Sequence, residues 1–367
     1  MKKLIKAISA LLVLALSITL VGCDNKKGDI EVGIILPTVE QNRWIQDKNQ
    51  FEEMLDNVGF TSSVLFSQGS SITEKANVES LVEKNMKVLI ISAQDTEAAA
   101  DSIKAAKEAG VIVIAYDRLI TNSDGVDYFV SFDSKEVGAA QAQYLVDHKP
   151  EGKGIPFYLY TGLPSDSNSF LFFEGSWPIL QPYFADGTFV IANCPEANNL
   201  KDKKELTQEE EQRIIMQVST DWLPEIARSK AESHLAIADK SMKGDVLILS
   251  PNDGSAVAIS DVFSQDPDIK SFIITGQDAD LDSVGYIIEG KQSMTVMKNT
   301  NKLATEACNM AMKILKGEEV EINATSNNGK LFVPTLQIPV DVVTADNYME
   351  KLVDTGYYTL NQINAHR

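Results

Sequence analysis

The order of apolar and amphipathic segments constrains the fold of this chain more than any other feature. Short, almost continuously apolar runs alternate with longer amphipathic segments from residue 30 to residue 116. Such runs are typical of parallel strands buried on both faces of a sheet, and the segments between them have the length of crossover helices. The expected strands are 30–37, 61–66, 87–92 and 111–116, and the expected helices are 43–58, 74–84 and 96–109.

The same alternation restarts after an apolar run at 127–134, which predicts a second unit. So many parallel strands exceed one open sheet of ordinary size, and 367 residues suffice for two domains. We therefore expect an α/β fold of two Rossmann-like lobes. The polar stretch 195–219 is expected to form a surface excursion or an added helix. The further strands are expected at 155–161, 188–193, 245–250, 271–275 and 293–297.

The formal net charge of −19 at pH 7 excludes one class of partner. Nucleic-acid-binding domains carry clustered Lys and Arg side chains on one face. This acidic chain has no such basic footprint, so we expect no nucleic-acid partner.

The first residues indicate an export signal rather than part of the fold. Residues 1–22 combine a basic start with an apolar run of signal-peptide length. Leu20-Val21-Gly22-Cys23 resembles the lipobox of bacterial lipoproteins, in which the peptide is cut before the Cys and diacylglycerol is attached to its thiol. A plain secretory signal or an N-terminal membrane anchor is the alternative. The resemblance implies lipidation of Cys23, a polar tether at 23–29, and attachment to the extracytoplasmic face of the cell membrane.

The other two cysteines and the three histidines show no pattern of a metal or cofactor site. Cys308 lies on the apolar stripe of an expected helix, and Cys194 follows an apolar strand. We expect both thiols to be unpaired and to lie in opposite lobes, with a disulfide between them as the alternative outside the cell. His148, His234 and His366 are scattered along the chain, so neither a metal nor a cofactor is expected.

Polar side chains directly follow three of the apolar strands. Ligands of open α/β sheets bind outside the carboxyl ends of the strands, so convergent polar groups there indicate a cleft. Helix N-capping by Asp or Asn is the alternative explanation at any single position. The residues concerned are Asp117 and Arg118, Asn252 and Asp253, and Gln277, Asp278 and Asp280.

This combination of side chains suits a sugar. Each sugar hydroxyl both donates and accepts hydrogen bonds; carboxylates accept, guanidinium and ammonium groups donate, and amides do both. The apolar faces of a pyranose ring also stack on aromatic side chains. Trp44 lies at the start of the first expected helix, and Trp222 precedes another, with Thr220 as its candidate cap and Pro224 in its first turn. Ordinary core packing is the alternative for each Trp.

Eight short motifs, in order from residue 30 to about residue 358, resemble those of the periplasmic sugar-binding proteins of ABC importers. They are most similar to the xylose-binding and multiple-sugar-binding group. The resemblance implies a type I fold, with two lobes joined by a three-stranded hinge. It also implies a monosaccharide ligand of the xylose, glucose, galactose or arabinose type and an ABC permease as partner, and we expect a monomer. The motifs are RWIQD, AYDRLI, FDSKEVGAAQA, PSDSN, DWLPE, SPNDG, GQDAD and MTVMKNT.

Nine residues of these motifs correspond to sugar contacts of the family. The chain departs from the family pattern at Leu163, where the family has Ser, and at Ser167 and Ser169, on either side of a contact residue. The corresponding residues are Arg43, Trp44, Asp117 and Arg118 on the first lobe, Asn168, Trp222, Asn252 and Asp278 on the second, and Lys298 near the hinge.

The fold implied by the resemblance has three crossings between lobes. We place them near 131–133, 296–299 and 332–334. The first lobe then comprises 29–131 plus 299–332, and the second comprises 133–296 plus 333–361.

Other functional classes fit the sequence less well. A glycosidase needs two cooperating carboxyl groups, but Asp117 has Arg118 beside it and Asp278 sits in an amide-rich turn, so we expect no enzyme. A sugar-responsive repressor needs a helix-turn-helix, and none precedes residue 30. A sensor that presents bound sugar to a membrane receptor or histidine kinase stays open as the alternative to transport.

Overall fold

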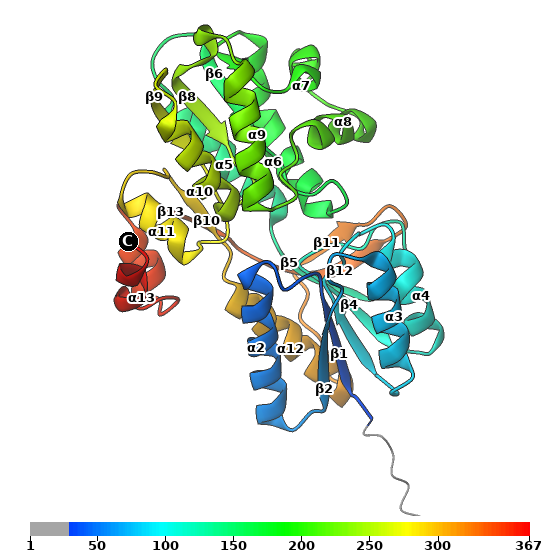
Figure 1. Ribbon diagram of the computed structural model, residues 1–367. Coiled ribbons are helices and arrows are strands. Elements are labelled where there is room, and N and C mark those ends of the chain that lie inside the picture. Colours follow the sequence, from blue (N-terminus) through cyan, green and yellow to red (C-terminus); the bar gives the residue numbers. More distant parts are fainter. Residues whose placement is uncertain (1–28) are drawn as a thin grey trace, which may run out of the picture.

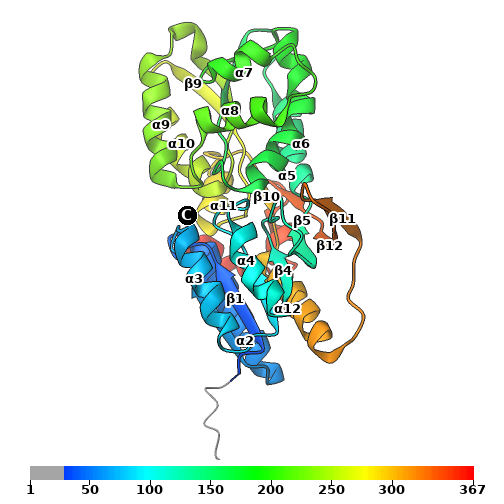
Figure 2. The ribbon, with the colours of Figure 1, turned by 90° about the vertical axis from the view of Figure 1, so that its right-hand side faces the viewer.

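The computed structural model describes residues 29–367. The expected signal peptide at 1–22, the lipidation site Cys23 and the tether up to residue 28 lie outside the described residues. Two lobes lie one above the other, and the chain segments that connect them run through the middle of the molecule (Figures 1 and 2). Each lobe is a sheet, mostly of parallel strands, with helices on both faces. The predicted two-lobed α/β fold is confirmed.

The first lobe contains a seven-stranded sheet in the order β11-β12-β5-β4-β3-β1-β2. β11 is antiparallel to β12, and the other neighbouring pairs are parallel. Helices α2 and α12 cover one face through Phe51 and Leu303, and helices α3 and α4 cover the other through Val78 and Ile103. The elements are β1 (Val32–Leu36), α2 (Asn42–Val58), β2 (Ser62–Phe66), α3 (Ser71–Val82), β3 (Val88–Ile91), α4 (Ala99–Glu108), β4 (Ile112–Tyr116), β5 (Tyr128–Phe132), α12 (Thr300–Lys316), β11 (Ala324–Asn327) and β12 (Phe332–Ile338).

The second lobe contains a parallel sheet in the order β7-β6-β8-β9. Helices α5, α6 and α8 enclose one apolar core with this sheet, and α9 and α10 enclose another. A short antiparallel pair, β10 and β13, adjoins this lobe at its junction with the first. The elements are α5 (Ser134–His148), β6 (Ile155–Leu159), α6 (Ser167–Ala185), β7 (Phe189–Ile191), α7 (Pro195–Leu200), α8 (Gln208–Val218), α9 (Pro224–Ile237), η1 (Lys240–Met242), β8 (Gly244–Leu249), α10 (Asp253–Gln265), β9 (Ile269–Ile274), α11 (Leu281–Ile288), β10 (Thr295–Met297), β13 (Asp341–Val343), η2 (Met349–Val353) and α13 (Leu360–Ala365).

The third crossing between the lobes comes later than predicted. Strand β12 pairs in parallel with β5 as far as Ile338, so residues 333–338 belong to the first lobe and not to the second. Val333 and Ile338 are buried in the two cores on opposite faces of the first sheet, which holds the strand there. The chain therefore crosses between Ile338 and Asp341, and the expected crossing at 332–334 is wrong.

The cysteines and the polar excursion lie where the sequence indicates. Cys194 and Cys308 are free and buried, Cys194 in a core of the second lobe and Cys308 in a core of the first, which confirms the expectation for both. The stretch 195–219 folds into α7 and α8 on the surface of the second lobe. Thr207 and Glu210 form a capping box at the start of α8, so this added segment has its own helix signal.

Several helices that begin at the edge of a sheet facing the other lobe are capped by side chains. Asp133, Asp166 and Asn252 accept hydrogen bonds from backbone N–H groups at the starts of α5, α6 and α10. Cap residues and candidate ligand residues therefore share the same short turns. At each position, the hydrogen bonds of the side chain show whether it caps the helix or faces the cleft.

Within residues 29–367, no helix is both long and apolar enough to cross a membrane. The same residues contain no group of three or more His, Cys, Asp or Glu side chains placed to hold a metal ion.

Candidate functional site

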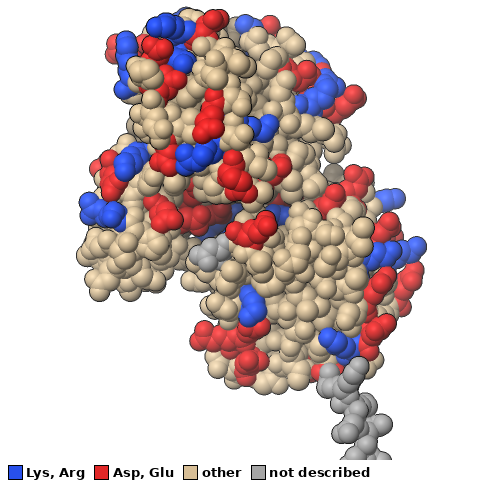
Figure 3. All heavy atoms as spheres, viewed as in Figure 1, with Lys and Arg blue, Asp and Glu red and all other residues tan. Residues whose placement is uncertain are grey.

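A cavity of about 730 Å³ lies between the two lobes. Acidic side chains gather around the hollow between the lobes in the space-filling view (Figure 3). The structure brings all nine residues singled out from the sequence to the walls of this cavity: Arg43, Trp44, Asp117, Arg118, Asn168, Trp222, Asn252, Asp278 and Lys298.

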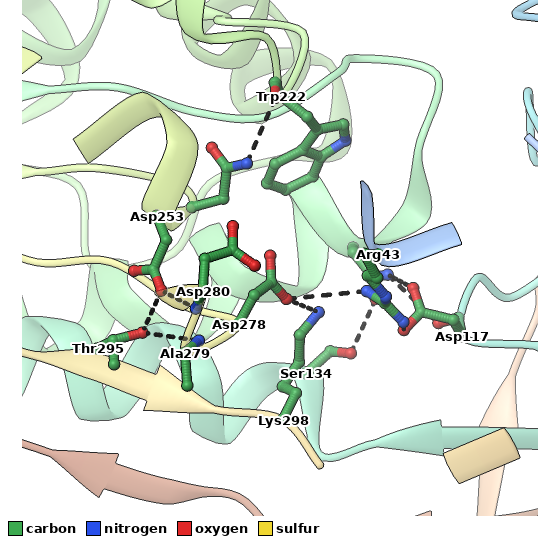
Figure 4. Close-up of polar contacts among 12 residues, drawn as sticks. Arg43, Asp117, Ser134, Trp222, Asp253, Asp278, Ala279, Asp280, Thr295 and Lys298 are labelled. Atoms are coloured by element: carbon green, nitrogen blue, oxygen red, sulfur yellow. Dashed lines mark hydrogen bonds and ion pairs between the residues drawn. The ribbon is translucent and has the colours of Figure 1, made fainter. Parts of the chain in front are cut away.

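Arg43, at the start of α2, lies among carboxylates of both lobes. Its Nη2 donates to Asp117 Oδ2 at 2.5 Å, and its Nη1 lies 3.8 Å from Asp278 Oδ1 across the cleft (Figure 4). Burial alone would raise the pKa of Asp117, but the nearby cations, Arg43 foremost, lower it to about 2. Asp117 is therefore ionised at every physiological pH.

Arg118, the next residue along the chain, makes a different set of contacts. Its Nε lies 2.7 Å from Asp166 Oδ2 of the second lobe, and its Nη1 donates to the carbonyl oxygen of Ala93 at 3.0 Å. Trp222 Nε1 also donates to Asp166 Oδ2, at 3.1 Å. Burial raises the pKa of Asp166, against the lowering effect of Arg118. Asp166 thus joins the guanidinium of one lobe to the indole of the other.

Asp278 and Lys298 form the charged part of the second-lobe wall. Lys298 Nζ lies 3.0 Å from Asp278 Oδ1, and the ammonium group also lies 5.6 Å from the ring centre of Phe132 and 5.7 Å from that of Phe172. Figure 4 shows the Asp278 carboxylate joined to both Lys298 and Arg43. One carboxylate is thus shared by two cations in a largely buried position, while Lys298 faces the cavity with two aromatic neighbours.

The two asparagines of the site already have protein partners. Asn252 Oδ1 accepts from the backbone N–H of Ser255 at 3.3 Å, and its Nδ2 donates to the carbonyl oxygen of Trp222 at 3.3 Å. Helix capping, the alternative weighed for this position, is therefore correct for Asn252. Asn168 Nδ2 donates to Asp117 Oδ1 at 3.1 Å, and its Oδ1 accepts from Ser134 Oγ at 2.8 Å, so this amide bridges the lobes.

Both tryptophans are mainly buried and expose only a limited surface to the cavity. The Arg43 guanidinium lies 4.4 Å from the Trp44 ring centre, and the Arg118 guanidinium 5.4 Å. Trp222 is 6% exposed and meets Phe172 edge to face at 5.9 Å. Each ring therefore combines core packing with a place on the cavity wall.

The turn before α9 differs from the expectation for its cap. Leu223, and not Thr220, is the N-cap residue, and Pro224 is the first helical residue. Thr220 Oγ1 donates instead to the carbonyl oxygen of Thr161 at 3.1 Å. This bond ties the Trp222 turn to the end of β6 rather than to the helix.

Left-handed backbone conformations are concentrated at this site. Asp117, Trp222, Asp278 and Ala279 have φ angles of +63°, +64°, +107° and +59°. Such conformations are uncommon for residues other than glycine, and for a bulky side chain such as Trp they are outliers. Strain of this kind gathers at functional sites, where surrounding contacts hold it in place. The backbone thus indicates a binding function independently of the side chains.

Residues 32–319 match the family model described as the periplasmic binding protein domain. The chain belongs to the periplasmic binding protein family. Among its relatives, the multiple sugar-binding periplasmic protein SbpA of Azospirillum brasilense is 35% identical over 338 residues, 89% of each chain. The D-xylose-binding periplasmic protein of Haemophilus influenzae is 30% identical over 355 residues, 97% of this chain and 98% of the relative.

A solved structure of a solute-binding protein superposes closely on this one. The carbohydrate transporter solute-binding protein of Chloroflexus aurantiacus, in complex with D-glucose, has a TM-score of 0.88 and 52% identity, covering 91% of this chain and 98% of that chain. This similarity and the family match confirm the type I architecture and the resemblance drawn from the motifs. Like its relatives, this periplasmic binding protein is a binding protein and not an enzyme.

Several lining residues were not singled out as contacts from the sequence. Gln277 is 3% exposed, and its Oε1 is buried without a hydrogen-bond partner. Asp253 accepts from Gln292 Nε2, from Thr295 Oγ1 and from the N–H of Asp280, all at 2.9 Å, and burial raises its pKa. The sequence places Gln277 and Asp253 among the polar groups at the strand ends, in the same turns as the predicted contacts, but the family motifs do not mark them as contacts. Asp166, Tyr358 and His366 also line the cavity, and of these only Asp166 lies within a quoted motif.

Proposed function

We propose that this protein captures a monosaccharide of the xylose, glucose, galactose or arabinose type between its lobes and delivers it to an ABC permease. The observation that carries the proposal is the composition of the cavity wall, which combines carboxylate, guanidinium, ammonium and amide groups with two indole rings. Several of these groups are held by contacts that cross the cleft.

The arrangement of charges suits hydroxyl groups better than an ionic ligand. Arg43, Lys298 and Arg118 each lie within 4 Å of a carboxylate, so positive charge in the wall is offset by negative charge. Hydroxyls can accept from the cations and donate to the carboxylates, and such charge-assisted bonds are strong. Gln277 lines the cavity and its Oε1 is buried without a hydrogen-bond partner, so a bound hydroxyl would satisfy it.

The relatives support the same ligand class. The Chloroflexus aurantiacus protein and an ABC transporter solute-binding protein from Clostridium phytofermentans, which has 29% identity and a TM-score of 0.78, were solved with glucose. The Haemophilus influenzae relative is a D-xylose-binding protein. Glucose and xylose differ by one hydroxymethyl group, so both belong in the first panel of ligands.

A thermal-shift and calorimetric panel of monosaccharides tests the proposal. A ligand at about 100 times its dissociation constant stabilises the folded state by roughly 2.7 kcal/mol. Asp278→Ala should weaken binding of the best sugar by roughly 2–3 kcal/mol, because Lys298 and Arg43 lose a buried partner. Asp186→Ala serves as the control, because this carboxylate pairs with Lys153 at the surface and neither residue lines the cavity. Saturable binding of none of the sugars would overturn the proposal.

Ligand-dependent closure follows from the division of contacts between the lobes. A sugar that touches both walls makes more contacts in a closed form, and only such differential affinity shifts the equilibrium between forms. Small-angle scattering should show the radius of gyration falling on binding, with weaker binding and less closure for Trp222→Ala. An unchanged radius at saturating sugar would contradict closure.

Lipid anchoring at Cys23 would place the binding protein beside its permease. Intact mass analysis of membrane-extracted protein should show a diacylglyceryl adduct on a chain that begins at Cys23, and Cys23→Ser should release the protein from the membrane. Sedimentation of the released protein should give a monomer.

Uptake of labelled sugar by cells that lack this protein, with and without complementation, tests delivery against sensing. Loss of uptake supports transport. Unchanged uptake with loss of a transcriptional response would favour the sensor instead.

A further inference from the structure

A buried carboxylate, Glu74, lies in the first lobe outside the residues that line the cavity. Glu74 is on α3, its side chain is 0% exposed, and its Oε2 accepts from the N–H of Gln94 at 2.7 Å and from Ser67 Oγ at 3.2 Å. Its Oε1 is buried without a hydrogen-bond partner. A buried acid of this kind needs an explanation beyond packing, because it carries a large desolvation penalty when ionised.

The loop that Glu74 holds is connected to the binding site in two ways. Gln94 belongs to the turn after β3, and the neighbouring Ala93 carbonyl accepts from Arg118 Nη1 at 3.0 Å. Two residues further on, Thr96 reaches the second lobe, where its N–H and its Oγ1 donate to the carbonyl oxygen of Ser165 at 2.9 and 3.2 Å. One turn thus supports a cavity-lining arginine and also forms a contact between lobes.

We propose that Glu74 is a positioning residue, which holds the 93–96 turn and through it Arg118, so that sugar affinity increases when Glu74 is ionised. The inference rests on the proposed function, because it concerns the affinity of the same cavity. Glu74 itself does not touch the ligand site, since it acts through Gln94 and Ala93.

The charges around Glu74 set the sign of the effect. Burial raises the pKa of Glu74 to about 7, against the lowering effects of the Gln94 N–H, the Ser67 hydroxyl and Arg118, while Asp95 adds to the rise. Among charged groups, Arg118 and Asp95 have the largest effects on the pKa of Glu74. The ionised form is the better acceptor for Gln94 and attracts Arg118. Removing water from the cleft strengthens this attraction, so binding favours the ionised form and affinity should increase as pH rises through about 7.

Calorimetric titration of the whole protein with D-glucose from pH 5.5 to 8.5 tests the inference. The affinity of the parent should rise roughly fivefold across this range, which is a typical size for coupling between two sites. Glu74→Gln should reduce the rise and hold the affinity near the low-pH level of the parent. Asp95→Asn should move the midpoint of the rise to lower pH, because it removes a charge that raises the pKa of Glu74.

The outcomes separate this inference from the proposed function. A pH-independent affinity in the parent, or the same pH dependence in Glu74→Gln as in the parent, would overturn the role of Glu74 while sugar binding stands. The second result would point to Asp280, which lines the cavity and whose pKa burial also raises to about 7. If Glu74→Gln does not fold, the pH profile of affinity in the parent and the shift of its midpoint in Asp95→Asn still test the role of Glu74. Absence of binding by any monosaccharide at every pH would overturn the proposed function, and this inference with it.

Discussion

The two walls of the cleft hold their ligand-facing groups by different means. The first-lobe wall presents Arg43, Asp117 and Arg118, which are fixed mainly by ion pairs and hydrogen bonds. The second-lobe wall presents Trp222, whose indole is held largely by close packing against Phe172 and Gly162. The first-lobe wall should therefore be sensitive to the loss of a charge, and the second-lobe wall to a small increase in side-chain volume.

The largest effect is expected from removing the central charge of the first wall. Asp117→Ala leaves Arg43 and the Asn168 amide without their carboxylate partner in a buried position. Breaking a buried pair on one side costs about 3–5 kcal/mol, and urea denaturation should show this loss in the free energy of unfolding. Lys153→Ala, which removes a surface pair with Asp186, should leave the unfolding curve unchanged. Similar curves for Asp117→Ala and Lys153→Ala would contradict the assigned role of charge.

A single methyl group tests the second wall. A Cβ on Gly162 would lie 2.0 Å from the Trp222 ring, so Gly162→Ala must displace the indole although Gly162 itself does not line the cavity. Overpacking of this kind costs about 1–3 kcal/mol, and we expect a loss of the same order in sugar affinity by calorimetry. Gly187→Ala, at an open turn with φ of +74°, should change folding stability but not affinity. Unchanged affinity in Gly162→Ala would show that the position of the indole is unimportant.

A pH-dependent effect of intermediate size concerns Asp47, which lies behind Arg43. Burial raises its pKa to about 7, against Arg43 and the Tyr116 hydroxyl, which donates to Asp47 Oδ2 at 2.8 Å. As pH rises toward 7, the folded state keeps the proton on Asp47 while the unfolded state releases it. The contribution of Asp47 to the free energy of unfolding is therefore present at low pH and is lost as pH rises toward 7. Asp47→Asn should flatten the decline in unfolding free energy between pH 4 and 7 by on the order of 1 kcal/mol for each unit by which the pKa is raised.

The exposed face of the same helix provides the control for this measurement. Glu52→Gln alters an acid that pairs with Lys48 at the surface. Its pH profile should follow that of the parent. If Asp47→Asn also follows the parent, the buried acid does not titrate as described.

The smallest expected effect separates capping from ligand binding at Asn252. Asn252→Ala removes the cap of α10 and should cost about 1 kcal/mol of stability, whereas Asn252→Ser retains an acceptor for the Ser255 N–H and should cost less. Thermal denaturation measures both. A Ser variant of normal stability that binds sugar much more weakly would restore Asn252 as a direct contact.

The location of the site could be predicted from the sequence, because strand ends and the order of short motifs are visible along a single chain. Asp117, Asn252 and Asp278 each follow an apolar strand, and parallel sheets bring such ends to a common edge. The sequence does not predict which of these side chains pair with one another, because the paired groups lie far apart in the chain. Asp166 pairs with Arg118 across 48 positions, and Asn168 reaches Asp117 across 51.

The fold itself was predicted well where hydrophobic periodicity was strong and less well where a strand continues past its expected end. β12 continues to Ile338 because Val333 and Ile338 are buried on opposite faces of the first sheet. A single sequence does not show which neighbour a late strand will pair with. The third crossing was therefore placed too early.

The late position of β12 in the sequence also determines when the first lobe can be completed during synthesis. β12 lies inside the first sheet, between β5 and β11, yet it is made long after the other parallel strands of that sheet. A chain that emerges from its amino end cannot complete its first lobe until residue 338 has been synthesised, and until then β5 has an unpaired edge. Truncation at residue 319, where the family match ends, would leave that edge open permanently and favour aggregation over a smaller working protein.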